Sequence, residues 1–267
     1  MARAITRTFE RLRSEGKKAF IPFITTGDPD LDTTVRIVLE MERAGAHLVE
    51  LGIPFSDPLA DGPVIQRASE RTLRKGYRMA DYLETARRIR LETSIPLILF
   101  SYFNPILRYG LEDFAHDARR AGIDGVLVTD VTPEEAGEYC FCLDRYDLDS
   151  IFLVAPTSSR ARIEKICGCA RGFVYLVSRT GVTGAQEKLS ESILPTLNRV
   201  RETTALPVAV GFGISRPEQV RAVWDVADGA VVGSAIVGHI EREQGAPDLP
   251  ARIGSFCRWL TGGTATP

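Results

Sequence analysis

The stretch from residue 19 to residue 52 shows the repeating unit from which the fold is predicted. It reads AFIPFITTGDPDLDTTVRIVLEMERAGAHLVELG. An apolar run, Ala19 to Thr25, is followed by an amphipathic segment, Leu31 to Ala44, and by a second apolar run, His47 to Gly52. Apolar runs of strand length are typical of parallel strands that are buried on both faces. The stretch therefore predicts a strand, a helix and a second strand.

The same alternation continues along the chain and brings the number of apolar runs to eight. The remaining runs are Pro96 to Ser101, Gly125 to Asp130, Ser150 to Ala155, Gly172 to Val177, Pro207 to Gly211 and Gly229 to Val232. Helical patterns separate them at Ala80 to Leu91, Leu111 to Ala121, Pro133 to Arg145, Arg160 to Cys169, Ser190 to Thr203 and Arg216 to Trp224. Pro133 and Pro217 are expected in first helical turns, and Gly45 and Gly122 just after helix ends.

Eight strand–helix units predict an α/β fold that closes into a single (β/α)8 TIM barrel. An open doubly wound sheet is the alternative, but no G-x-G-x-x-G follows the first run. The length of 267 residues suits one barrel, so residues 1–267 are expected to form one domain. Residues 1–15 contain an extra N-terminal helix, Ile5 to Glu15, expected to cover the barrel floor. Pro247 to Leu260 is expected to be the last outer helix, and residues 261–267 a frayed tail.

Charge and composition exclude several classes of protein. The formal net charge is -2 without a long run of one sign, which gives no reason to expect a nucleic acid or an anionic membrane as partner. No signal peptide or membrane-length apolar stretch is evident, so a cytoplasmic protein is expected. The cysteines are Cys140, Cys142, Cys167, Cys169 and Cys257. Zinc binding by the two C-x-C pairs is the alternative to reduced thiols, but side chains two apart on a helix diverge.

Glycine-rich segments follow the last two apolar runs. They are Gly211-Phe212-Gly213-Ile214-Ser215 and Gly233-Ser234-Ala235-Ile236-Val237. In TIM barrels the loops after strands 7 and 8 commonly bind phosphate through N–H groups at a helix start. We therefore expect these two segments to bind a phosphate, with the Ser234 hydroxyl group as a further donor and the loop from Ser178 to Gly184 after the sixth run as the source of a third N–H. Simple turns are the alternative.

Two carboxylates lie in the segment from residue 50 to residue 63, which reads ELGIPFSDPLADGP. Glu50 is inside an apolar run, where an inward-pointing carboxyl group would have its pKa raised by desolvation and could exchange a proton near neutral pH. Asp61 ends a proline-rich loop and would offer a second acceptor. The alternatives are a salt-bridged structural acid for Glu50 and a helix N-cap for Asp61. None of the three histidines is expected to be catalytic.

This segment closely resembles the signature of the tryptophan synthase alpha family. The resemblance extends from about residue 5 to residue 260. The reaction that it implies needs no metal. It includes PFITTGDP at 22–29, YFNP at 102–105, DGVLVTD at 124–130, YLVSRTGVTG at 175–184, GFGIS at 211–215 and GSAIV at 233–237. The family cleaves indole-3-glycerol phosphate into indole and glyceraldehyde 3-phosphate, so the resemblance implies this retro-aldol reaction.

The resemblance also implies roles for individual residues. Glu50 would be the general acid and base, Asp61 would bind the indole N–H, and Tyr175 would lie beside the reacting centre. The phosphate would be bound at Gly184, Gly213, Gly233 and Ser234. The indole pocket would be lined by Phe23, Phe100, Tyr102, Leu127, Thr129, Thr183 and Phe212. Phe100, Thr129 and Thr132 depart from the commoner family pattern, and none of these departures removes a catalytic group.

The family's partner is a beta subunit that carries pyridoxal phosphate, and this chain is expected to need no cofactor of its own. Indole would pass to the beta subunit of an alpha2beta2 complex for L-tryptophan synthesis. The loop with Pro54 and Asp57 and the loop with Arg179 would face that partner. The alternatives are a stand-alone indole-glycerol-phosphate lyase, a catalytically weak allosteric subunit, and another phosphosugar enzyme such as an isomerase or epimerase.

Overall fold

Eight parallel strands form a closed barrel in the computed structural model, which describes residues 2–178, 186–211 and 213–263. Each strand pairs with the next along the chain, and β8 pairs with β1. The strands are β1 (Ala19–Thr25), β2 (Val49–Gly52), β3 (Leu97–Ser101), β4 (Gly125–Val128), β5 (Asp149–Val154), β6 (Val174–Val177), β7 (Val208–Gly211) and β8 (Gly229–Val232). The predicted (β/α)8 TIM barrel is confirmed.

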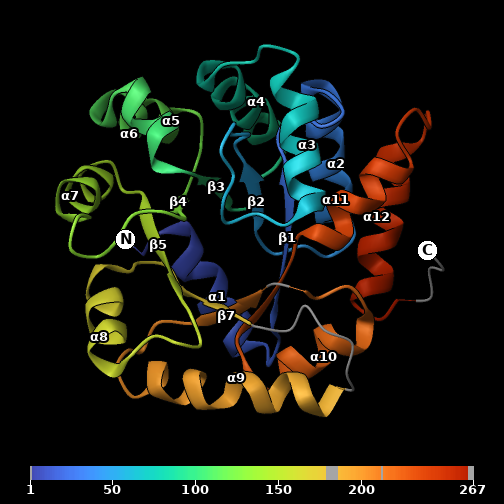
Figure 1. The fold of residues 1–267 in the computed structure, drawn as a ribbon. Coiled ribbons are helices and arrows are strands. Elements are labelled where there is room, and N and C mark those ends of the chain that lie inside the picture. The colour runs from blue at the N-terminus through green and yellow to red at the C-terminus, as the bar shows by residue number, and fades with distance from the viewer. Residues whose placement is uncertain (1, 179–185, 212, 264–267) are drawn as a thin grey trace.

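Helices surround the barrel, as Figure 1 shows. They are α1 (Ala4–Ser14), α2 (Leu31–Arg43), α3 (Pro63–Leu73), α4 (Met79–Glu92), α5 (Phe103–Tyr109), α6 (Leu111–Arg120), α7 (Gly137–Arg145), α8 (Arg160–Cys169), α9 (Gln186–Arg201), α10 (Pro217–Val226), α11 (Ser234–Arg242) and α12 (Leu249–Leu260). No helix in the described part of the chain is long and apolar enough to cross a membrane.

The extra N-terminal helix α1 packs against the inside of the barrel, as expected. Ile5, Phe9 and Leu12 are buried on one side of this helix. They belong to the same apolar cluster as inward-facing strand residues, and the Phe9 ring centroid lies 5.6 Å from that of Phe173. This burial removes apolar surface from water at the barrel floor, which stabilises the helix in its position.

Successive strand residues belong to two separate apolar cores. In β1, Ile21 and Phe23 lie in the cluster that fills the barrel, whereas Phe20 and Ile24 lie in the larger cluster between strands and helices. Side chains of a strand alternate between faces, and here both faces are covered. The apolar run therefore contains both inward and outward residues with no difference in polarity.

Several helix boundaries differ from the sequence prediction. Helix α7 begins at Gly137 and not at Pro133, because residues 133–135 form a turn closed by a hydrogen bond from Thr132 Oγ1 to Glu135 Oε2 (2.7 Å). Helix α9 begins at Gln186, four residues before the predicted start. Helices α3, α5 and α11 have no counterpart among the predicted ranges. Pro217 does occupy the first turn of α10.

The predicted positions of the two glycines and of the C-x-C pairs are confirmed. Gly45 and Gly122 follow helix ends with φ of 97° and 86°, a conformation that favours glycine. The C-x-C pairs lie within α7 and α8. Among the described residues, no group of three or more potential ligands is placed to hold a metal ion.

Candidate active site

Glu50 points into the barrel. The register places it opposite Phe23 of β1 and Ile98 of β3. Both of these neighbours belong to the apolar cluster inside the barrel. Registered residues of neighbouring parallel strands face the same side of the sheet, so Glu50 faces inward with them.

Burial gives the Glu50 carboxyl group an unusual proton affinity. The residue is 1% exposed, and its Oε1 atom has no hydrogen-bond partner among the described residues. Desolvation raises the pKa of Glu50 to about 8. Burial is the only cause of this shift and no described basic side chain contributes to it, so the alternative of a salt-bridged structural acid is wrong. At neutral pH the group carries a proton that it can give to a bound molecule.

Asp61 lies at the end of the loop that joins β2 to α3 and lines the same cavity as Glu50. Burial raises the pKa of Asp61 to about 6, and a hydrogen bond with the Tyr102 side chain opposes this shift. The N-cap of α3 is Gly62, so the alternative of a helix N-cap at Asp61 is wrong. The two carboxyl groups therefore prefer different protonation states near pH 7, which is the arrangement that separates acid and base roles.

Tyr175 of β6 completes this group from the opposite wall. Its side chain is 4% exposed, and its pKa is raised above the ordinary value by burial and by the nearby charge of Glu50. The neutral phenol is therefore the form that faces Glu50.

One cavity connects the predicted catalytic residues with the predicted phosphate site. It has a volume of about 110 Å³. Its lining consists of Phe23, Glu50, Asp61, Gly62, Ile65, Phe100, Tyr175, Gly213, Val231, Gly233 and Ser234. The Phe23 and Phe100 rings meet edge to face, with 5.2 Å between their centroids, and form an apolar wall. The cavity thus joins an apolar surface, two carboxyl groups and a glycine-rich end.

The glycine-rich end is the start of α11. Gly233 is the N-cap of this nine-residue helix and Ser234 is its first residue. The first N–H groups of a helix have no partner within the helix, and the helix dipole favours negative charge there. Gly213, after β7, adopts a φ of 76° on the same cavity. This end of the cavity is suited to bind an oxyanion such as phosphate.

Comparison with known proteins identifies the family. The sequence matches the family described as tryptophan synthase alpha chain over residues 9–256. The chain belongs to the tryptophan synthase alpha chain family. The alpha chains of Geotalea uraniireducens (strain Rf4) and Solibacter usitatus (strain Ellin6076) are 49% and 50% identical to it over 259 residues, which is 97% of each chain. As a tryptophan synthase alpha chain, the protein is an enzymatic subunit in tryptophan biosynthesis.

Solved structures agree with this assignment. Tryptophan synthase subunit alpha from Legionella pneumophila str. Paris has a TM-score of 0.89 and 36% identity, and the match covers 97% of each chain. A structure described as the tryptophan synthase a2b2 complex of Pyrococcus furiosus matches with a TM-score of 0.85 and 36% identity, covering 91% of this chain and 98% of that one.

Some residues expected in the indole pocket of an alpha chain lie outside the cavity wall. Leu127 is fully buried in the cluster inside the barrel. Thr129 follows β4 and lines a separate cavity of about 350 Å³ beside Asp130. Tyr102 is also absent from the wall and contacts the Asp61 loop instead. Four of the expected site residues lie outside the described residues, namely Arg179, Thr183, Gly184 and Phe212.

Three lining residues were missed by the sequence analysis. Gly62 and Ile65 come from the start of α3, and Val231 comes from β8. A signal for α3 was present, because Pro63 suits a first helical turn and Val64, Ile65 and Ala68 follow at helical spacing. Val231 had no signal of its own, since every residue of β8 is buried.

The loop expected to face a partner is buried at its base and exposed at its tip. Pro54 is buried, so it is not available to a partner, whereas Asp57 is exposed. Leu59, two residues later, is 94% exposed. An apolar side chain this exposed, beside the cavity, is the part of the loop that a partner could cover.

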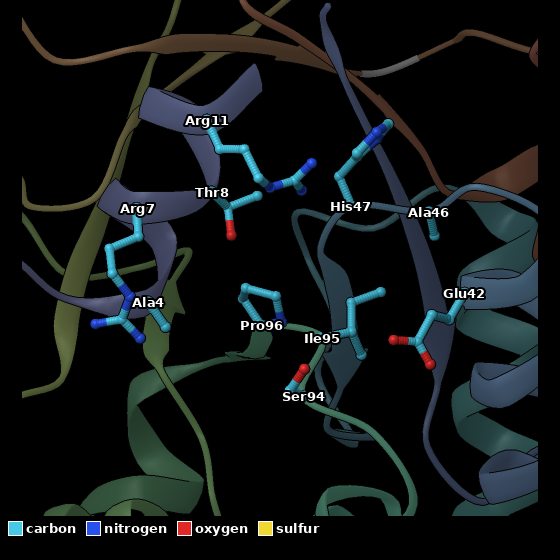
Figure 2. A pocket seen from close by; sticks show the side chains of 10 residues that line it. All are labelled: Ala4, Arg7, Thr8, Arg11, Glu42, Ala46, His47, Ser94, Ile95 and Pro96. Atoms are coloured by element: carbon cyan, nitrogen blue, oxygen red, sulfur yellow. The ribbon is translucent and has the colours of Figure 1, made fainter. Parts of the chain in front are cut away.

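A larger cavity, of about 420 Å³, lies at the opposite end of the barrel. Figure 2 shows Arg11 of α1 and Glu42 of α2 on different walls of this cavity. His47 accepts a hydrogen bond at Nδ1 from Phe20 N–H (3.1 Å), and burial together with the Arg11 charge lowers its pKa to about 4. His47 is therefore a neutral structural residue at neutral pH, remote from the carboxyl pair.

Proposed function

We propose that this chain cleaves indole-3-glycerol phosphate into indole and glyceraldehyde 3-phosphate, as a lyase. The observation that carries the proposal is the buried carboxyl group of Glu50, whose Oε1 atom has no hydrogen-bond partner among the described residues and which shares one cavity with Asp61 and the start of α11. The Phe23 and Phe100 rings offer an apolar wall to an aromatic group on the same cavity as the two carboxyl groups. A phosphate fits the helix start.

Glu50 is proposed to move both protons of the reaction. With its pKa at about 8, it is protonated at neutral pH and can transfer its proton to C3 of the indole ring. The Glu50 carboxylate then takes the proton of the hydroxyl group on the carbon attached to the ring. That C–O–H becomes the aldehyde, the C–C bond breaks, and its electron pair returns to the ring as indole forms.

Asp61 is proposed to hold the ring nitrogen. Protonation at C3 creates positive charge on the nitrogen, and an ionised carboxylate at that position stabilises the charge. With its pKa at about 6, Asp61 is largely ionised at pH 7. Tyr175 is placed beside Glu50, where its neutral phenol can contact the reacting carbon chain.

The phosphate is proposed to bind at Gly213, Gly233 and Ser234. Gly184 remains a proposed fourth contact, outside the described residues. The N–H groups at the start of α11 and the Ser234 hydroxyl group supply donors without a lysine. This interaction anchors the end of the substrate that does not react, so that the indole end is positioned at the carboxyl pair.

We further propose a beta subunit as partner, in an alpha2beta2 complex. The support is family membership, the Pyrococcus furiosus a2b2 structure, and the exposed Leu59 beside the cavity. The chemistry above needs only acid–base groups, so no cofactor is assigned to this chain. Pyridoxal phosphate is assigned to the beta partner, which would consume the indole.

The test is indole release from indole-3-glycerol phosphate, measured with and without added beta subunit. The wild-type chain should release indole, faster with the partner, and Glu50→Gln should lose at least about 1,000-fold in rate while still binding phosphate. Glu10→Gln, an exposed acid on α1, is the matched control and should match the wild type. A Glu50→Gln variant as fast as Glu10→Gln would refute the assignment of Glu50.

A further inference from the structure

Tyr102 connects the Asp61 loop to the barrel. It follows β3 directly, its side chain is 5% exposed, and its ring lies 5.1 Å from that of Phe55 in the loop. The Ala60 N–H donates a hydrogen bond to the Tyr102 hydroxyl oxygen at 2.9 Å. The hydroxyl group therefore holds the residue immediately before Asp61.

The same hydroxyl group still has a proton to donate. Because Tyr102 Oη accepts from Ala60 N–H, its own O–H proton is available to the Asp61 carboxylate, with which the Tyr102 side chain interacts. This interaction contributes to the pKa shift of each of the two groups. It opposes the upward shift of the Asp61 pKa, and the Asp61 charge contributes to raising the pKa of Tyr102 to about 12. The interaction therefore favours the ionised form of Asp61, although burial still keeps the pKa of Asp61 above its ordinary value.

The other hydrogen bonds around Asp61 are local. Leu59 N–H donates to Asp57 O (2.9 Å) and Asp61 N–H donates to Pro58 O (3.0 Å), both within the loop. Gln66 Nε2 donates to Asp61 O (2.8 Å) from the adjoining helix α3. These contacts shape the loop, but the barrel wall reaches the residues around Asp61 through the Tyr102 hydroxyl group.

We propose that Tyr102 is a positioning residue, which fixes the direction of the Asp61 side chain through its hydroxyl group. This inference rests on the proposed function, because it assigns Tyr102 to the carboxylate that binds the indole nitrogen. In this role Tyr102 acts on Asp61 through its hydroxyl group. A residue that only lines the indole pocket would act through its ring alone. A carboxylate free to rotate would lose the orientation that stabilises charge at the ring nitrogen.

The test compares Tyr102→Phe with Tyr82→Phe. Both substitutions remove one buried hydroxyl group and keep the ring, but the Tyr82 hydroxyl group lies on α4 and has no hydrogen-bond partner among the described residues. We expect Tyr102→Phe to lower kcat of indole release about 10- to 100-fold, as for loss of a hydrogen bond to a charged group, with KM changed less than about threefold. Tyr82→Phe should keep wild-type kinetics.

Two further measurements separate positioning from a purely structural effect. In the pH profile of kcat/KM, the acid limb of Tyr102→Phe should move to higher pH, since the bond that favours ionised Asp61 is gone. In an Asp61→Asn background, adding Tyr102→Phe should cost less than about threefold, because the group it positions is already neutral.

The outcomes are distinguishable from failure of the proposed function. Wild-type kinetics in Asp61→Asn would refute the role of Asp61 itself. If Asp61→Asn is impaired but Tyr102→Phe has the same kinetics as Tyr82→Phe, the positioning role is wrong. It is also wrong if the losses of activity from Asp61→Asn and Tyr102→Phe multiply in the double variant. If Tyr102→Phe does not fold, Phe55→Leu keeps the hydroxyl group and removes only ring packing. If Phe55→Leu then has near-normal kinetics, with the acid limb of its pH profile at the wild-type position, the positioning role of the hydroxyl group is supported. If Phe55→Leu loses as much activity as Asp61→Asn, the role is refuted.

Discussion

The side chain of Tyr175 lies directly over Gly211 of the neighbouring strand. A Cβ atom at Gly211 would be 2.0 Å from the Tyr175 hydroxyl oxygen and 2.6 Å from Cζ. Strand β7 therefore leaves a space for the phenol that only glycine provides. The placement of Tyr175 beside Glu50 depends on a residue that itself has no side chain.

Gly211→Ala should displace the Tyr175 ring and reduce kcat/KM for indole release about 10- to 100-fold. Steady-state kinetics with indole-3-glycerol phosphate measure this effect. Gly168→Ala on α8 is the control, since a Cβ there has nothing within 4 Å. Equal kinetics in the two variants would contradict the proposed position of Tyr175.

The rate of cleavage should depend on pH with a maximum between about 6 and 8. Glu50 must be protonated to act as the acid, and its pKa is raised to about 8, so activity falls above that pH. Asp61 must be ionised to hold the ring nitrogen, and its pKa is about 6, so activity falls below that pH. The measurement is kcat/KM from pH 5 to pH 9. The Asp61→Asn variant should lose the fall in kcat/KM at low pH. If that fall persists in the variant, it is caused by the titration of another group.

Glu50→Gln should increase the free energy of unfolding at high pH. Burial raises the native pKa of Glu50 from its ordinary 4.5 to about 8. The protonated carboxyl group stabilises the native state relative to the ionised form below the unfolded pKa, and this contribution is lost as pH rises through about 8. Glutamine cannot ionise, so the variant should exceed the wild type by roughly 2–4 kcal/mol at pH 8 and by little at pH 4.5.

Denaturant unfolding at the two pH values measures this difference. Glu10→Gln, exposed on α1, should show the same stability as the wild type at both. A Glu50→Gln variant that is less stable than the wild type at pH 8 would mean that the native carboxylate is paired.

Ser234→Asp should raise KM for indole-3-glycerol phosphate at least about 10-fold with little loss of stability. The new carboxylate would repel a phosphate at the start of α11, although an acid suits the first turn of a helix. Phosphate binding followed by calorimetry measures the change directly. Ser94→Asp, exposed at the other end of the barrel, is the control. Unchanged phosphate affinity in Ser234→Asp would place the phosphate elsewhere.

Leu59→Asp should weaken binding of the beta subunit about 10-fold or more while the chain alone keeps its basal indole release. Leu59 is 94% exposed, and a charge placed in a covered apolar contact is costly. Leu91→Asp on α4, where Leu91 is 70% exposed, is the matched control. Calorimetric titration with the beta subunit distinguishes the two variants. Equal affinity would remove Leu59 from the interface.

Much of the barrel could be predicted because strand and helix patterns are local. The range Ala19–Thr25 of β1 agrees with the predicted run, and the other strands differ at their ends by at most two residues. Helix α5 was missed because it begins within the YFNP segment and is only seven residues long. Pro133 was assigned to a helix because its own φ suits a first turn, although the chain forms a turn there before α7.

The sequence by itself determined the fold class, the family and the candidates Glu50, Asp61 and Ser234. Patterns of apolar residues, glycines and carboxylates are sufficient for this, because they record which residues can form buried strands, helix starts and proton donors. Only the tertiary structure decided that Glu50 points inward, since every residue of β2 is buried and the two faces look alike in sequence. It also decided that Tyr102 contacts the Asp61 loop and that Gly211 makes room for Tyr175. These relationships depend on barrel closure, which brings together residues from separate strands and loops.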